Sequence, residues 1–97
     1  MPQYYKDPDA VLDFLFDWSS WLASGESIDS HTVTVTCADE ETPTLLVDST
    51  SETSGIIFAW LSGGTAGYVY DVTCHMTTDN ATPRTDDRTM KVRIQER

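Results

Sequence analysis

Hydrophobic and polar residues alternate with a period of two along most of the chain. Residues 31–37 place two valines and a cysteine on one face and three threonines on the other. Such alternation is typical of a β-strand with one buried face. Residues 68–77 and 89–95 repeat the pattern, and the side chains that we expect to point inward there are Tyr68, Tyr70, Val72, Cys74, Met76, Met90, Val92 and Ile94.

Two further strands are expected between these segments. Gly55–Leu61 is almost continuously apolar and rich in β-branched and aromatic residues, which predicts a strand in the middle of a sheet. Thr44–Val47 is a shorter strand that follows Pro43. With the N-terminal segment included, the predicted core consists of Phe14, Phe16, Val33, Val35, Ile57 or its neighbour Phe58, Trp60, Tyr70, Val72, Val92 and Ile94.

The segment from residue 11 to residue 22 is ambiguous, because its apolar residues fit both a period of two and a helical spacing. We favour a strand over Val11–Asp17, since its aromatic residues suit a strand and both aspartates then face solvent. A short helical turn is expected at Ser19–Ala23. Residues 1–8 contain two adjacent tyrosines with little to bury them. We therefore expect an N-terminal arm over residues 1–8 and a single domain over residues 9–97.

Turn-forming residues separate the expected strands about every 8–15 residues. This spacing predicts an all-β fold, a small immunoglobulin-like or fibronectin-like β-sandwich. Tyr68 and Tyr70 follow a glycine-rich crossing at residues 62–67 and look like a tyrosine corner, in which a hydroxyl ties the crossing loop to a strand. The length of 97 residues suffices for one domain.

Acidic residues outnumber basic ones by 16 to 6, which gives the chain a net charge of −10. This charge argues against nucleic acid and anionic membranes as partners, because both attract surfaces rich in lysine and arginine. No apolar run is long enough for a transmembrane helix. The first residues lack the basic and apolar regions of a signal peptide, so we expect none.

Residues suited to metal binding or nucleophilic catalysis are few and do not converge. A zinc site would need His31, Cys37, Cys74 and His75, but positions 74 and 75 point to opposite faces of one strand. We therefore expect no catalytic residue, no metal and no cofactor. The order Cys37, Trp60, Cys74 is that of an immunoglobulin domain, which leaves a disulfide and two buried thiols as alternatives.

Five sequence blocks resemble a known family. They are KDPDAVLD at residues 6–13, DWSSWL at 17–22, WLSGGTAGY at 60–68, RTDDR at 84–88 and VRIQER at 92–97. In this order and spacing they resemble short proteins of tailed bacteriophages and prophages, described as fiber-tail adaptor or neck-region structural proteins. The resemblance implies a β-sandwich that bridges virion components and is made in the cytoplasm of the host bacterium. It brings no catalytic residue with it.

The resemblance leads us to expect a virion protein that links the phage tail or neck ring to fibers. Its expected partners are these virion proteins and further copies of the chain in a ring-like homo-oligomer, with a monomer in isolation. Two other roles stay open: a small module that binds a host surface glycan or protein, and a head decoration protein.

The two halves of the chain differ in charge. Residues 1–48 contain ten acidic residues and one basic residue, whereas residues 49–97 contain six acidic and five basic residues. We therefore expect a row of basic residues in the C-terminal half of one copy to meet a row of acidic residues in the N-terminal half of the next copy. The tyrosines of the arm would add contacts. The candidate interface residues are Tyr4, Tyr5, Asp9, Asp13, Asp17, Arg84, Arg88, Lys91, Arg93 and Arg97.

Overall fold

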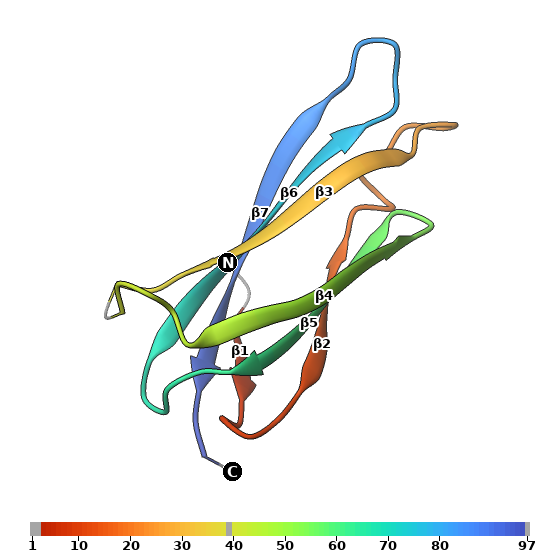
Figure 1. Cartoon of the computed structure of the whole chain (residues 1–97). Helices are drawn as coiled ribbons and strands as arrows, with labels where there is room; N and C mark the ends of the chain where they lie inside the picture. Colours follow the sequence, from red (N-terminus) through yellow and green to blue (C-terminus); the bar gives the residue numbers. More distant parts are fainter. Residues whose placement is uncertain (1–2, 39, 97) are drawn as a thin grey trace.

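The computed structural model describes residues 3–38 and 40–96. Within these residues every regular element is a strand, and Figure 1 shows how the strands form two facing layers. The elements are β1 (Gln3–Lys6), β2 (Leu12–Asp17), β3 (Ile28–Thr36), β4 (Leu45–Thr53), β5 (Ile56–Gly63), β6 (Val69–Thr78) and β7 (Thr85–Ile94).

The strands form a four-stranded sheet in the order β1-β7-β6-β3 and a three-stranded sheet in the order β2-β5-β4. β1 runs parallel to β7, and all other pairings are antiparallel. The molecule is elongated, with principal extents of 44 × 23 × 22 Å. The predicted all-β sandwich is confirmed, and β5 lies in the middle of its sheet as expected.

The core lies between the two sheets and follows the alternation along the strands. In β6 and β7 the even-numbered residues from 70 to 76 and from 90 to 94 are buried, and in β2 Phe14 and Phe16 are buried. Val33 and Val35 are only partly buried, because β3 is an edge strand. Most of the predicted core is therefore confirmed.

The prediction that Trp60 belongs to the core is wrong. Trp60 is 42% exposed, whereas Ile57, Ala59 and Leu61 are completely buried. Successive side chains of a strand point to opposite faces, so burial of these three residues turns Trp60 outward. The buried tryptophan is Trp18, which directly follows β2.

The expected helical turn at Ser19–Ala23 is not supported, because the described structure has a hydrogen-bonded turn there that begins at Trp18 and does not continue as a helix. The amide groups of Trp21 and Leu22 both donate to the carbonyl oxygen of Trp18, at 2.9 and 3.1 Å. A helix would next bond the amide of Ala23 to the carbonyl of Ser19. That amide instead donates to a carboxylate oxygen of Glu26 at 2.9 Å, which ends the turn.

The described part of the expected arm is strand β1 of the four-stranded sheet. Gln3–Lys6 pair with residues 91–94 of β7, and the ring of Tyr4 meets that of Phe14 edge-on at 5.7 Å. Lys6 is fully buried. Backbone pairing and this buried side chain join the segment to the domain, while residues 1–2 of the expected arm lie outside the described residues.

The predicted tyrosine corner is confirmed for Tyr70. Its hydroxyl oxygen accepts a 2.9 Å hydrogen bond from the amide of Thr65, in the crossing between β5 and β6, and its hydroxyl group donates to Glu40. Gly64 in the same crossing has φ = +99°, and a Cβ atom there would lie 2.6 Å from Cγ1 of Ile94. The tyrosine and the glycine together hold the crossing against the end of β7.

Candidate functional site

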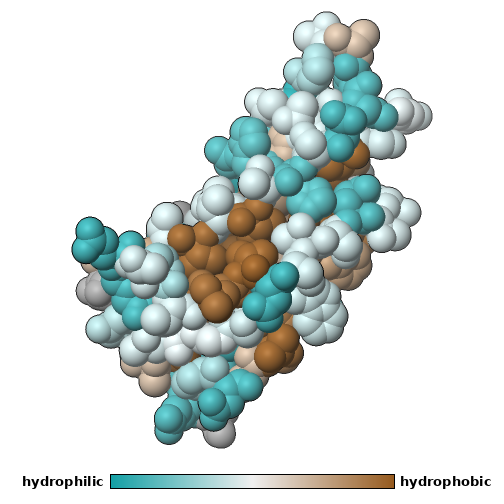
Figure 2. All heavy atoms as spheres, in the orientation of Figure 1, coloured by the Kyte–Doolittle hydropathy of each residue, from teal (hydrophilic) through white to brown (hydrophobic). Residues whose placement is uncertain are grey.

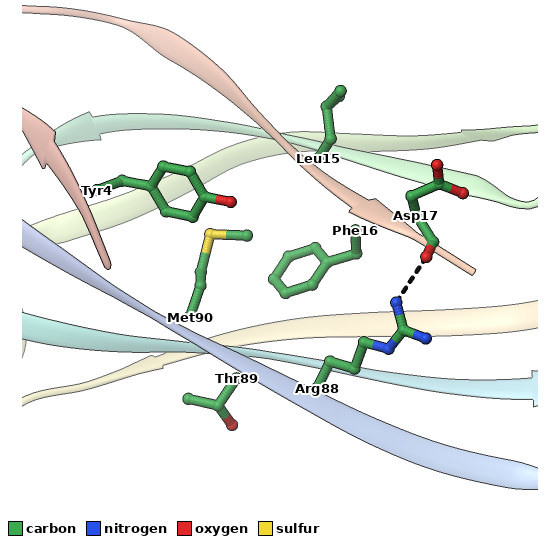
Figure 3. A pocket seen from close by; sticks show the side chains of 7 residues that line it. All are labelled: Tyr4, Leu15, Phe16, Asp17, Arg88, Thr89 and Met90. Carbon is green, nitrogen blue, oxygen red and sulfur yellow. Dashed lines mark hydrogen bonds between the residues drawn. The ribbon is translucent and has the colours of Figure 1, made fainter. Parts of the chain in front are cut away.

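A groove of about 330 Å³ opens along one edge of the sandwich, where β2 of one sheet faces β1 and β7 of the other. Figure 3 shows Phe16 between Met90 and Arg88, with Tyr4 beyond Met90 and Leu15 pointing away. The lining residues are Tyr4, Leu15, Phe16, Asp17, Arg88, Thr89 and Met90. Three of them, Tyr4, Asp17 and Arg88, belong to the interface predicted from sequence.

Arg88 spans the groove from β7 to the end of β2. One terminal nitrogen donates a 2.6 Å hydrogen bond to the carbonyl oxygen of Asp17, and the guanidinium carbon lies 4.2 Å above the ring of Trp18. Arg88 has the same parity as the buried Met90, so its side chain crosses toward β2. It therefore lies on the opposite face of β7 from Lys91 and Arg93.

The carboxylate of Asp17 is held by the turn that follows β2. It accepts hydrogen bonds from the hydroxyl and the amide of Ser19, at 2.6 and 2.9 Å. These two bonds lower the pKa of Asp17. Asp17 thus keeps its negative charge at the rim of the groove.

Arg84, another residue of the predicted interface, binds partners within its own chain. Its guanidinium forms an ion pair with Glu26, and it lies 4.0 Å above the ring of Trp21. The hydrogen bonds from Arg84, aided by the amide of Ala23, lower the pKa of Glu26 to about 2. This cluster joins the turn after β2 to the loop between β6 and β7, and it covers Trp21.

The remaining interface residues are scattered over the surface. Lys91 pairs with Asp71 at 2.8 Å, across the outer face of the four-stranded sheet. Tyr5 and Arg93 are exposed and pair with each other in the parallel β1–β7 register. Asp9 and Asp13 are also exposed. Arg97 lies outside the described residues, and the contact between the basic row of one copy and the acidic row of the next stays a prediction.

Two exposed apolar surfaces were missed by the sequence reasoning. One is the seam between the edge strands β3 and β4, where Figure 2 shows a hydrophobic patch. The other is the outer face of the three-stranded sheet, which carries Leu15, Leu46 and Trp60, each more than 40% exposed. The alternation over residues 12–17 already places Leu15 on the same face as the two aspartates. For Trp60 no such signal exists, because both faces of β5 are apolar.

The two cysteines are free thiols, Cys74 in β6 and Cys37 directly after the neighbouring strand β3. In the β3–β6 register Cys74 lies opposite Val33, and Val33 precedes Cys37 by four residues. Four residues of strand span about 13 Å, well beyond the roughly 7 Å limit for the Cα atoms of a disulfide. Burial raises the pKa of the Cys74 thiol to about 11, which keeps it neutral and unreactive.

The described residues contain no group of three or more side chains arranged to hold a metal ion. They also contain no helix long and apolar enough to cross a membrane. The charged groups that line the groove, Arg88 and Asp17, are bound to backbone or to neighbouring side chains, and the hydroxyl of Thr89 bonds to that of Thr73. The accessible surface includes the apolar side chains of the three-stranded sheet and the exposed aspartates beside them.

Fold and surface together define a class: a small β-sandwich with apolar and acidic faces suited to contacts with other proteins. A family model described as podophage GP4 fiber-tail adaptor protein gp77 matches residues 6–93. The chain therefore belongs to this family of phage fiber-tail adaptor proteins, as its sequence blocks indicate. No curated protein matches the chain.

Proposed function

We propose that the chain is a non-enzymatic structural protein of a podophage tail, where it links fibers to the tail or neck ring. The observation that carries this proposal is the family match over residues 6–93, which takes in almost all of the sandwich. The family's members are fiber-tail adaptors, and membership implies a place in the virion.

The architecture supports this role because the two sheets present chemically different outer faces. The four-stranded sheet exposes threonines, together with the Lys91–Asp71 pair. The three-stranded sheet exposes Leu15, Leu46 and Trp60. A linker must contact two partners at once, and a rigid sandwich with two unlike faces is suited to that task.

The charge of the chain supports a monomer in isolation and a ring-like set of copies only in the particle. Copies that each carry a net charge of −10 repel one another in solution. Contacts with the tail would offset this repulsion and hold the copies side by side. Synthesis takes place in the cytoplasm of the host bacterium, before the particle is assembled.

Deletion of the gene from the phage genome, followed by complementation with the wild-type chain, tests the proposed function. We expect particles without the chain to keep filled heads and to lose their fibers in electron micrographs, and complementation to restore the fibers. Fully fibered particles in the deletion strain would contradict the proposal. Unstable heads with fibers retained would indicate a head decoration protein instead.

A further inference from the structure

The outer face of the three-stranded sheet carries a continuous row of apolar side chains along its central strand. In β5, buried residues alternate with Ile56, Phe58 and Trp60, which therefore point away from the core. Trp60 is 42% exposed, and Ile56 and Phe58 are half-buried.

Each neighbouring strand extends this row. Leu15 of β2 lies directly opposite Phe58 and is 49% exposed. Leu46 of β4 lies opposite Ser62, one step along the same face from Trp60, and is 55% exposed. Residues opposite or diagonal on one face of a sheet are within contact range. We call Leu15, Leu46, Phe58 and Trp60 the β2–β5–β4 patch.

The ionisable residues of the three strands that carry the β2–β5–β4 patch are all acidic, while Lys6 and Arg88 of the other sheet donate hydrogen bonds to the backbone carbonyls of Gly63 and Asp17. β2, β4 and β5 contain no lysine and no arginine. Asp13 lies directly opposite Trp60. Asp17 lies opposite Ile56, and Asp48 accepts a 2.8 Å hydrogen bond from the hydroxyl of Ser62 beside Leu46. An apolar centre with a charged rim is the usual anatomy of a protein interface.

The charges disfavour a second copy of the chain as the occupant of this patch. A face-to-face contact would bring the aspartates of one copy against those of the other. A contact with the basic residues of another copy is also weak, because Arg84, Arg88 and Lys91 already bind within the chain. Among the described residues, Arg93 is the one basic side chain with no hydrogen bond or ion pair.

We propose that the β2–β5–β4 patch docks onto an apolar surface of another tail protein, and that lysine or arginine side chains of that protein flank the surface. This proposal rests on the proposed function and names the face and the chemistry of one of its contacts. Trp60 is the anchor, since exposed tryptophans carry much of the binding energy in interfaces of this kind. The aspartates attract the basic side chains of the partner, which steers association and adds specificity. This attraction weakens as the salt concentration rises.

The test uses complementation of the deletion phage with variants and counts copies of the chain per purified particle by mass spectrometry. Trp60→Ser removes the anchor, and Asp13→Lys reverses the charge beside it. The matched controls are Val11→Ser, an exposed apolar residue just before β2 and outside the patch, and Asp29→Lys, an exposed aspartate on β3. Circular dichroism of each purified variant checks that it is folded.

We expect Trp60→Ser and Asp13→Lys each to lower incorporation at least tenfold, and both controls to stay within twofold of wild type. Wild-type incorporation of both patch variants would overturn the proposal while leaving the adaptor function intact. Absence of the wild-type chain from particles would instead overturn the adaptor function itself.

A photo-reactive p-benzoylphenylalanine at position 60 identifies the occupant in assembled particles. We expect a cross-link to another tail protein, within a segment that contains lysine or arginine. A cross-link only to a second copy of the chain, or only to an acidic segment, would overturn the proposal. Capture of a soluble glycan at this face, with no protein cross-link, would overturn it in favour of a glycan-binding module.

Discussion

The ammonium group of Lys6 donates a 2.8 Å hydrogen bond to the carbonyl oxygen of Gly63, 57 residues further along the chain. A second bond, of 2.9 Å, goes to the carbonyl oxygen of Asp7. Burial lowers the pKa of Lys6, and the negative charges of nearby aspartates partly oppose this shift. Two of the five sequence blocks, KDPDAVLD and WLSGGTAGY, thus meet at this contact, and both serve the fold.

Replacement of Lys6 by methionine should destabilise the domain by about 1–3 kcal/mol, because it leaves the Gly63 carbonyl without its partner. The free energy of unfolding in urea measures this change. Lys91→Met is the matched control, since Lys91 forms an exposed pair with Asp71 whose loss should cost about 0–1 kcal/mol. Equal effects of the two substitutions would show that the Lys6 contact does not stabilise the fold.

Gly64→Ala should destabilise the domain more than Gly67→Ala, by about 1–3 kcal/mol. Both glycines have positive φ, at +99° and +90°, so both substitutions carry backbone strain. Only at Gly64 would the new Cβ collide with Ile94, at 2.6 Å from Cγ1, whereas nothing lies within 4 Å at Gly67. Melting temperatures of the two variants give the comparison, and identical values would contradict the packing of the crossing against β7.

The Glu26–Arg84 pair should make stability depend on pH in the acid range. The pKa of Glu26 falls from 4.5 to about 2 in the folded chain, chiefly through its hydrogen bonds with Arg84. A carboxylate with a lowered pKa stabilises the fold above its unfolded pKa, and this contribution is lost as pH falls from about 4.5 toward 2. Glu26→Gln should therefore cost stability at pH 7 and progressively less as the pH approaches 2.

Urea unfolding of wild type and Glu26→Gln at pH 7, 4 and 2.5 measures this difference. Glu41→Gln, at an exposed acidic position, is the control for the change in net charge. A gap between wild type and Glu26→Gln that stays constant with pH would rule out the proposed role of the ion pair.

The two thiols should react at very different rates. Cys37 is half-buried, whereas Cys74 is fully buried with its pKa raised to about 11. A thiol reagent such as Ellman's reagent should modify one cysteine of the folded chain and both after denaturation without a reductant. Modification of neither thiol in the denatured, unreduced chain would reveal a disulfide and contradict the strand register.

The parts of the fold that could be predicted from sequence are those in which only one face of a strand is apolar. β6 and β7 alternate cleanly, so the inward positions of Val72 and Val92 follow from the sequence. β5 is apolar on both faces, and the sequence therefore contains no signal that turns Ile57 inward and Trp60 outward. That orientation depends on the pairing with β2 and β4, a tertiary effect.

The candidate site was predictable only in part for a related reason. Arg84, Arg88 and Lys91 are basic residues near the C-terminus, and the sequence alone names no partner for them within the chain. Their partners, Glu26, the carbonyl of Asp17, and Asp71, are 58, 71 and 20 residues away along the chain. Such contacts form only once the strands pair and the two sheets pack. The same packing exposes Leu15 and Trp60, which become the main surface for docking.

The location of the chain in the intact particle tests the central claim most directly. Electron cryomicroscopy of the phage that encodes it, with the sandwich fitted to the density, supplies this measurement. We predict density for the chain between the tail or neck ring and the base of each fiber, with the β2–β5–β4 patch against another tail protein. Density for the chain on the head surface, or at the fiber tip away from the tail, would contradict the account.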